Sequence, residues 1–93
     1  MSLTLQNPLK DPSAVLDYVF DWTEWLATGE TITDHTITAD TGITVDSSTE
    51  DTGKVTVWLS GGTAGINYKV ACLITTTEGR TDERTIWIKV VER

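Results

Sequence analysis

Several segments of the chain alternate apolar and polar residues with a period of two. The first such segment, residues 15–22, carries its large side chains at even positions: Leu16, Tyr18, Phe20 and Trp22. A β-strand places successive side chains on opposite faces, so this alternation predicts strands that are buried on one face only. Threonine supports this prediction, because 18 of the 93 residues are Thr and β-branched residues suit a pleated surface. The sequence therefore predicts an all-β fold.

The same alternation predicts six to seven short strands and no long helix. Further strands are expected at residues 30–38, 43–45, 54–60, 66–76 and 80–91. Residues 22–26 have the apolar spacing of a single helical turn, and the polar, acidic stretch 46–53 is expected to be a loop. Such a pattern is typical of an antiparallel sandwich or a small barrel.

The first 13 residues differ from the rest and predict an extended N-terminal arm. Pro8 and Pro12 restrict the backbone, and three leucines are spaced along an otherwise polar segment: Leu3, Leu5 and Leu9. We expect one β-sandwich domain over residues 14–93, because a chain of this length holds a single core. A frayed terminus is the alternative interpretation of the arm.

The last two strands form the clearest hairpin in the sequence. Their inward residues are all even-numbered, so the residue numbers of facing pairs must sum to an even number. A loop of residues 77–79 satisfies this parity and places Gly79 where three-residue loops require a left-handed residue. A loop of residues 78–80 has the same parity, so the register stays open between the two.

Tyr68 favours an immunoglobulin-like sandwich. It begins the penultimate strand directly after the glycine-rich stretch 61–65, where a tyrosine corner bonds back to the preceding backbone. Val70 stands where antibody domains have a disulfide cysteine, so the fold would be free of disulfides. A Thr-rich solenoid is the competing interpretation, but its isoleucines are unevenly spaced and the pattern stops after Val45.

No motif predicts catalysis, a metal or a cofactor. His35 stands alone without ligand spacing, Cys72 falls on an inward face, and the acidic stretch around Asp46 lacks the calcium-loop pattern. The chain has no nucleophile-elbow motif, and a small sandwich suggests no cleft for a pair of catalytic carboxylates. We therefore expect a protein that is not an enzyme.

Charge and exposed aromatic residues point to protein partners. The net charge of −7 opposes binding to nucleic acid or anionic membranes. Residues 11–53 hold ten acids and no Lys or Arg, whereas residues 54–93 hold six bases and four acids. Trp58 and Trp87 fall at outward positions, and exposed tryptophan often marks a contact surface. The start of the chain lacks a secretory signal, so we expect it to be made in a cytoplasm and to stay there or leave by lysis.

The sequence resembles small immunoglobulin-like virion proteins of tailed bacteriophages, which are described as fibre–tail adaptors. The resemblance runs from about Lys10 to Val91 and rests on short motifs along the chain: Lys10-Asp11-Pro12, Val15-Leu16-Asp17-Tyr18, Asp21-Trp22-Thr23-Glu24-Trp25-Leu26, Gly29-Glu30-Thr31-Ile32, Gly42-Ile43-Thr44-Val45-Asp46-Ser47-Ser48, Thr56-Val57-Trp58-Leu59-Ser60-Gly61-Gly62-Thr63-Ala64-Gly65, Tyr68 and Gly79-Arg80-Thr81-Asp82. It implies a non-enzymatic structural part of a phage particle, located in the virion.

Two classes of function follow. The first is a virion assembly protein, either an adaptor joining fibre, tail or neck components or a capsid decoration protein, present in several copies in a symmetric assembly. The second is a carbohydrate-binding module that uses its exposed tryptophans. For the first class we expect partner contacts at Leu3, Leu5, Leu9, Trp25, Trp58 and Trp87, and structural roles for Tyr68, Trp22 and Gly79.

Overall fold

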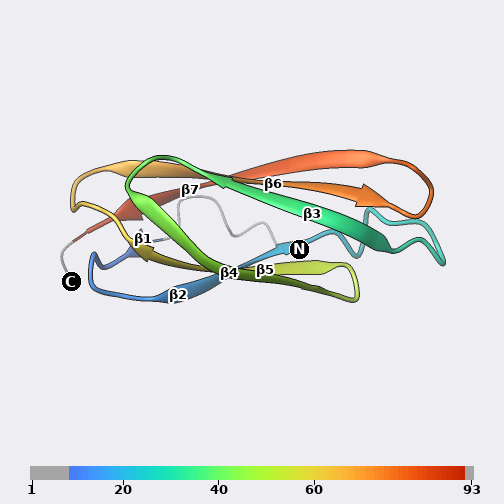
Figure 1. The fold of residues 1–93 in the computed structure, drawn as a ribbon, viewed down its shortest axis with the longest axis horizontal. Coiled ribbons are helices and arrows are strands. Elements are labelled where there is room, and N and C mark those ends of the chain that lie inside the picture. Colours follow the sequence, from blue (N-terminus) through green and yellow to red (C-terminus); the bar gives the residue numbers. More distant parts are fainter. Residues whose placement is uncertain (1–8, 92–93) are drawn as a thin grey trace.

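The computed structural model describes residues 9–91, which form two β-sheets packed face to face (Figure 1). The strands are β1 (Leu9–Lys10), β2 (Leu16–Asp21), β3 (Ile32–Ala39), β4 (Ile43–Asp51), β5 (Lys54–Gly61), β6 (Asn67–Thr76) and β7 (Thr81–Val90). One sheet has the order β1-β7-β6-β3 and the other β2-β5-β4. All neighbours are antiparallel except β1 and β7, which are parallel.

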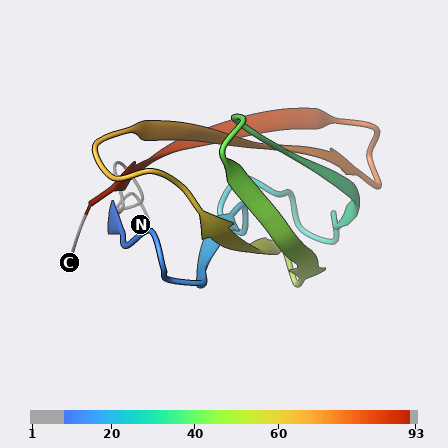
Figure 2. The same ribbon diagram turned by 60° about the vertical axis from the view of Figure 1, so that its left-hand side comes forward.

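This arrangement confirms the predicted all-β sandwich. The order β2-β5-β4 against β7-β6-β3 is compatible with the B-E-D and G-F-C sheets of an immunoglobulin-like fold. The chain changes sheets at residues 40–42, between β3 and β4, where Figure 2 shows the tight connection. The sequence of 93 residues thus closes one core between two layers.

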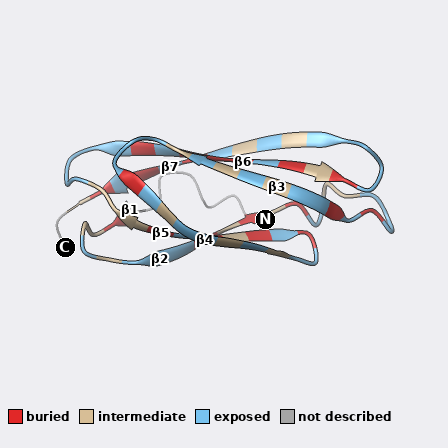
Figure 3. Ribbon diagram, in the orientation of Figure 1, coloured by how far each residue is buried: buried red, intermediate tan, exposed pale blue. Residues whose placement is uncertain are grey.

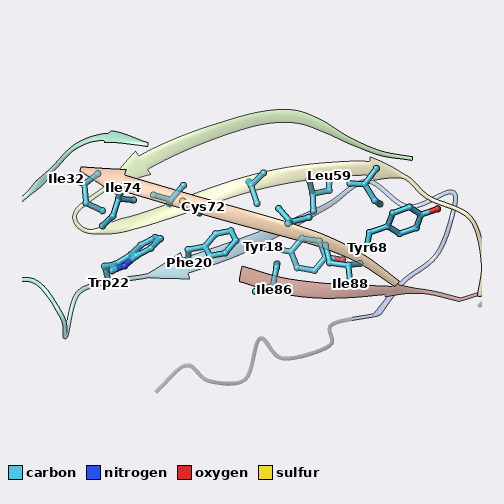
Figure 4. Close-up of a cluster of buried hydrophobic side chains, with 14 of the residues drawn as sticks. Tyr18, Phe20, Trp22, Ile32, Leu59, Tyr68, Cys72, Ile74, Ile86 and Ile88 are labelled. Atoms are coloured by element: carbon cyan, nitrogen blue, oxygen red, sulfur yellow. The ribbon is translucent and has the colours of Figure 1, made fainter. Parts of the chain in front are cut away.

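The core lies between the sheets and consists mainly of the even-numbered residues of β2, β6 and β7 and the odd-numbered residues of β5. Phe20, Val57 and Ile88 are typical members, and Figure 4 shows such side chains meeting between the two layers. Buried and exposed bands alternate along the strands in Figure 3, as the period of two requires. Leu16 departs from the prediction: it begins β2 at the end of the sheet, where it is 37% exposed.

The hairpin of β6 and β7 has the register with loop 77–79. Thr75 lies opposite Thr81, and the Thr76 amide donates to the Arg80 carbonyl at 2.9 Å. Gly79 has φ +79°, which confirms the predicted left-handed position. The single turn predicted at residues 22–26 is also present, because the Leu26 amide donates to the Trp22 carbonyl at 3.0 Å.

The predicted acidic loop at residues 46–53 is wrong. Most of it belongs to β4, which extends to Asp51 and pairs with β5 through a register shift between Val45 and Ser47. In β4 only Ile43 is buried, so this strand lacks the apolar alternation that marks β2, β5, β6 and β7. A two-residue turn at Thr52 and Gly53, both with positive φ, then leads into β5.

Tyr68 forms the predicted tyrosine corner. Its hydroxyl accepts a hydrogen bond from the Thr63 amide at 2.9 Å, and its ring is buried beside Gly42 and Gly62. A Cβ at position 42 would lie 2.8 Å from the Tyr68 ring, so the ring needs glycine there. Figure 4 shows the Tyr68 hydroxyl at the end of the core. This bond fastens the connection between β5 and β6 to the sandwich.

Candidate interaction surfaces

The outer face of the three-stranded sheet carries Trp58 on its central strand, β5. Trp58 is 43% exposed and lies directly opposite Asp17 on β2. Two residues further along β5, the Ser60 hydroxyl donates to an Asp46 carboxylate oxygen at 2.9 Å, which places a second acid on this face. We refer to Trp58, Asp17 and Asp46 as the acidic tryptophan face.

The outer face of the four-stranded sheet carries Trp87 on β7. Trp87 is 47% exposed and lies directly opposite Lys69 on β6, while Lys89 follows two residues later on the same face. Both lysine side chains are exposed. We refer to Trp87, Lys69 and Lys89 as the basic tryptophan face.

The two exposed tryptophans lie on opposite sheets, as predicted. Trp58 belongs to the sheet β2-β5-β4 and Trp87 to the sheet β1-β7-β6-β3. The thickness of the sandwich therefore separates them, and they do not form one stacking platform for a sugar chain. The geometry favours two separate contact surfaces over a carbohydrate site.

Trp25, a further predicted contact residue, is half-buried and engaged within the chain. The Arg80 guanidinium lies over its ring at 4.0 Å, and Arg80 also donates to the Trp25 carbonyl at 3.3 Å. The Glu30 carboxylate orients the guanidinium, accepting from Arg80 Nε at 2.9 Å and from Nη2. Trp25 is therefore stacked beneath an arginine that a buried carboxylate orients.

Glu30 is the buried centre of this cluster. Besides Arg80, its carboxylate accepts from the Thr76 hydroxyl and from the Ala27 amide, the latter at 2.9 Å. The hydrogen bonds from Arg80, Thr76 and Ala27 lower the pKa of Glu30 to about 2. The cluster joins the segment between β2 and β3 to the β6–β7 hairpin, next to Gly79.

Trp22, for which the sequence predicts a structural role, lies just after the end of β2. It is fully buried, its indole N–H donates to Asp82 at 3.0 Å, and Arg84 lies over its ring at 4.9 Å. Arg84 also donates to the Asp21 carbonyl at 2.6 Å. These contacts connect the beginning of β7 to the end of β2.

Of the predicted arm, residues 1–8, which include Leu3 and Leu5, lie outside the described residues. Leu9 and Lys10 form β1 and pair with Lys89 and Val90 of β7. Lys10 is fully buried, and its Nζ donates to the carbonyl oxygens of Asp11 at 2.9 Å and Gly61 at 2.6 Å. Burial lowers the pKa of the Lys10 ammonium against the opposing effect of nearby carboxylates.

Gly61 ends β5 in the opposite sheet, so the Lys10 ammonium connects the two sheets where the arm leaves the sandwich. Neither this contact nor the Glu30 cluster was predicted from the sequence. The even position of Glu30, in phase with the inward Ile32, was a usable signal for a buried carboxylate. Lys10 precedes the alternating segments, so no pattern marked it.

Within residues 9–91, no group of three or more His, Cys, Asp or Glu side chains could hold a metal ion. His35 contacts the Ser48 hydroxyl at 3.1 Å across the edges of the two sheets. Cys72 is fully buried in the core, where burial raises the pKa of its thiol to about 12. The same part of the chain contains no helix long and apolar enough to cross a membrane.

A shallow depression of about 590 Å³ lies at the end of the sandwich, between the segment after β2 and the β4–β5 turn. Its lining includes Thr23, Leu26, Thr31 and Glu50. The Glu50 carboxylate already accepts from the Gly53 amide at 3.0 Å, which holds the turn.

Comparison with known proteins agrees with the resemblance found in the sequence. A search of the curated proteins found no match to the chain. A family model described as podophage GP4 fiber-tail adaptor protein gp77 matches residues 10–89. This match spans both sheets, from the buried Lys10 to Lys89 beside Trp87. The chain therefore belongs to the family of podophage GP4 fiber-tail adaptor proteins.

Proposed function

We propose that the chain is a non-enzymatic structural protein of a bacteriophage virion, which joins fibre, tail or neck components through protein–protein contacts. The family match over residues 10–89 carries this proposal. The exposed tryptophan on each outer sheet face supports it, because tryptophan surrounded by polar residues is the usual centre of a protein interface.

Strand β1 pairs with β7, so the N-terminal arm begins at a defined position on the sandwich. Lys10 is buried and bonded to Gly61, so a partner that binds residues 1–8 would be held at a defined position relative to both sheets. We propose that Leu3 and Leu5 contact a neighbouring virion protein, since apolar side chains on a polar segment gain most when a partner buries them. Assembly would take place in the host cytoplasm.

The adaptor function is tested by producing phage in cells that lack the chain and supply it from a plasmid with a small tag. Without the chain, particles should have filled heads and lack attached fibres, and electron cryomicroscopy of complemented particles should place the tag between tail and fibre. Density on the faces of the head would instead identify a capsid decoration protein and overturn the adaptor proposal.

The arm is tested in the same complementation system. Deletion of residues 1–8 keeps β1 and Lys10, so the sandwich should remain folded while incorporation into particles is lost. The double variant Leu3→Ser with Leu5→Ser keeps the full length of the chain and removes only the two apolar side chains. It should also fail to be incorporated into particles. Normal occupancy of both variants would show that the arm takes no part in docking.

A further inference from the structure

The two tryptophan faces of one chain carry opposite charges. Asp17 and Asp46 lie beside Trp58, whereas Lys69 and Lys89 lie beside Trp87. All four charged side chains are exposed. The acidic tryptophan face therefore presents two negative charges beside Trp58. On the basic tryptophan face, the exposed Asp40 just after the end of β3 also lies next to Lys69, whose backbone amide donates to the Asp40 carboxylate at 2.8 Å.

Both faces lie toward the same end of the sandwich. Trp58 is three residues before the end of β5 at Gly61, and Trp87 is three residues before the end of β7 at Val90. The Gly65 amide donates to the Val90 carbonyl at 2.8 Å, so the connection after β5 runs beside the end of β7. Both tryptophans are held by paired strands, which keep the two surfaces rigid.

Several other charges of the outer faces lie further along the strands. Lys54 on β5 stands between Asp21 and Asp51, which are its direct neighbours on β2 and β4. On the other sheet, Glu83 lies opposite Leu73, four residues before Trp87. With Asp40 counted, two lysines and one carboxylate lie around Trp87, against two carboxylates around Trp58, so the sign of the local charge still differs between the two faces.

We propose that the partner of the acidic tryptophan face is the basic tryptophan face of a second copy of this chain. The proposal rests on the proposed function, because it names one of the protein–protein contacts through which the adaptor would assemble. Two identical faces would bring like charges together, which disfavours a symmetric pair formed through either face alone. Pairing unlike faces brings Lys69 and Lys89 toward Asp17 and Asp46 and covers both indole rings.

Such a contact is head-to-tail, since each copy uses a different face on each side. Only the two end copies of such a row keep an unused face, an acidic one at one end and a basic one at the other. The two sheets are on opposite sides of a thin sandwich, so successive copies stack across the layers without steric conflict between the two contacts.

The proposal is tested with two double variants in sedimentation velocity experiments. Trp58→Ser with Asp17→Ser removes the acidic tryptophan face, and Trp87→Ser with Lys69→Ser removes the basic one. Wild-type chain should form concentration-dependent oligomers that weaken as salt is raised, because the charge contribution is screened. Each variant alone should sediment as a monomer, and an equimolar mixture should form a species limited to two chains.

The mixture is decisive, because it contains one intact acidic face and one intact basic face. Ile66→Ser, which removes an exposed apolar side chain from the β5–β6 connection outside both sheet faces, is the control and should associate like wild type. Equal urea midpoints would show that all variants fold. A monomeric wild type, self-association of either double variant alone, or no complex in the mixture would overturn the proposal.

Complementation separates this proposal from the adaptor function. A chain that enters particles at the fibre–tail junction but sediments as a monomer retains the adaptor function and loses the self-association. A chain that associates through unlike faces and is absent from that junction retains the self-association and loses the adaptor function.

Discussion

The substitution Tyr68→Phe removes one oxygen atom and leaves the Thr63 amide without its acceptor. The bond is between two neutral groups at 2.9 Å in a partly buried site, and the ring itself stays buried among the same neighbours. Leaving such a donor unpaired costs about 1–3 kcal/mol, and partial access of water places this case at about 1–2 kcal/mol. The free energy of unfolding should fall by that amount.

Urea unfolding followed by tryptophan fluorescence measures the effect. With a slope of about 1–1.5 kcal/mol per molar, the midpoint should fall by roughly 1 M while the slope stays unchanged. Thr63→Ala is the control: its exposed side chain makes no hydrogen bond within the described residues, so stability should stay within about 0.5 kcal/mol of wild type. A Tyr68→Phe midpoint equal to that of wild type would refute the assigned role of the tyrosine corner.

Three further predictions follow from the turn, the buried carboxylate and the buried thiol. Thr52 has φ +54° at the first position of its two-residue turn, so Thr52→Asn should raise the urea midpoint, since Asn tolerates this conformation better. The folded pKa of Glu30 is lowered to about 2 from an ordinary 4.5, so its contribution to stability is complete above about pH 4.5 and is lost as the pH falls through 2. Glu30→Gln should flatten the dependence of the urea midpoint on pH across that window, and an unchanged dependence would contradict the assignment. Because Cys72 is fully buried and its thiol pKa is raised to about 12, a thiol reagent should label it only at the rate of unfolding, and rapid labelling under native conditions would show otherwise.

The strand faces and the hairpin loop could be predicted from the sequence, because side-chain periodicity and turn chemistry act locally. The inward even positions of β6 and β7 follow from alternation alone, and Gly79 identified the hairpin loop. Parity also placed Trp58 and Trp87 on the outside of the sandwich. These features depend only on neighbours in sequence or on one facing strand.

The strand β4 and the buried charged residues could not be predicted, because they depend on partners that are distant in the sequence. Strand β4 is polar beyond Val45 and is held by its pairing with β5, so a polar strand was predicted to be a loop. Glu30 and Arg80 are 50 residues apart, and Lys10 and Gly61 are 51 apart, so neither contact leaves a local signature. A buried charge becomes predictable only when the register of both sheets is known.

The parallel pairing of β1 with β7 gives the chain a mechanical property. The N-terminal end of β1 and the C-terminal end of β7 point in opposite directions, so a pull on the two chain ends loads their contacts in shear. In this geometry the backbone bond from the Val91 amide to the Lys10 carbonyl and the bond from the Lys10 ammonium to the Gly61 carbonyl resist together, instead of opening one at a time. Single-molecule pulling from both ends should give a higher rupture force for wild type than for Lys10→Met, and equal forces would show that the ammonium bears no load. The described part of the chain should therefore resist tension best when the force acts along β1 and β7.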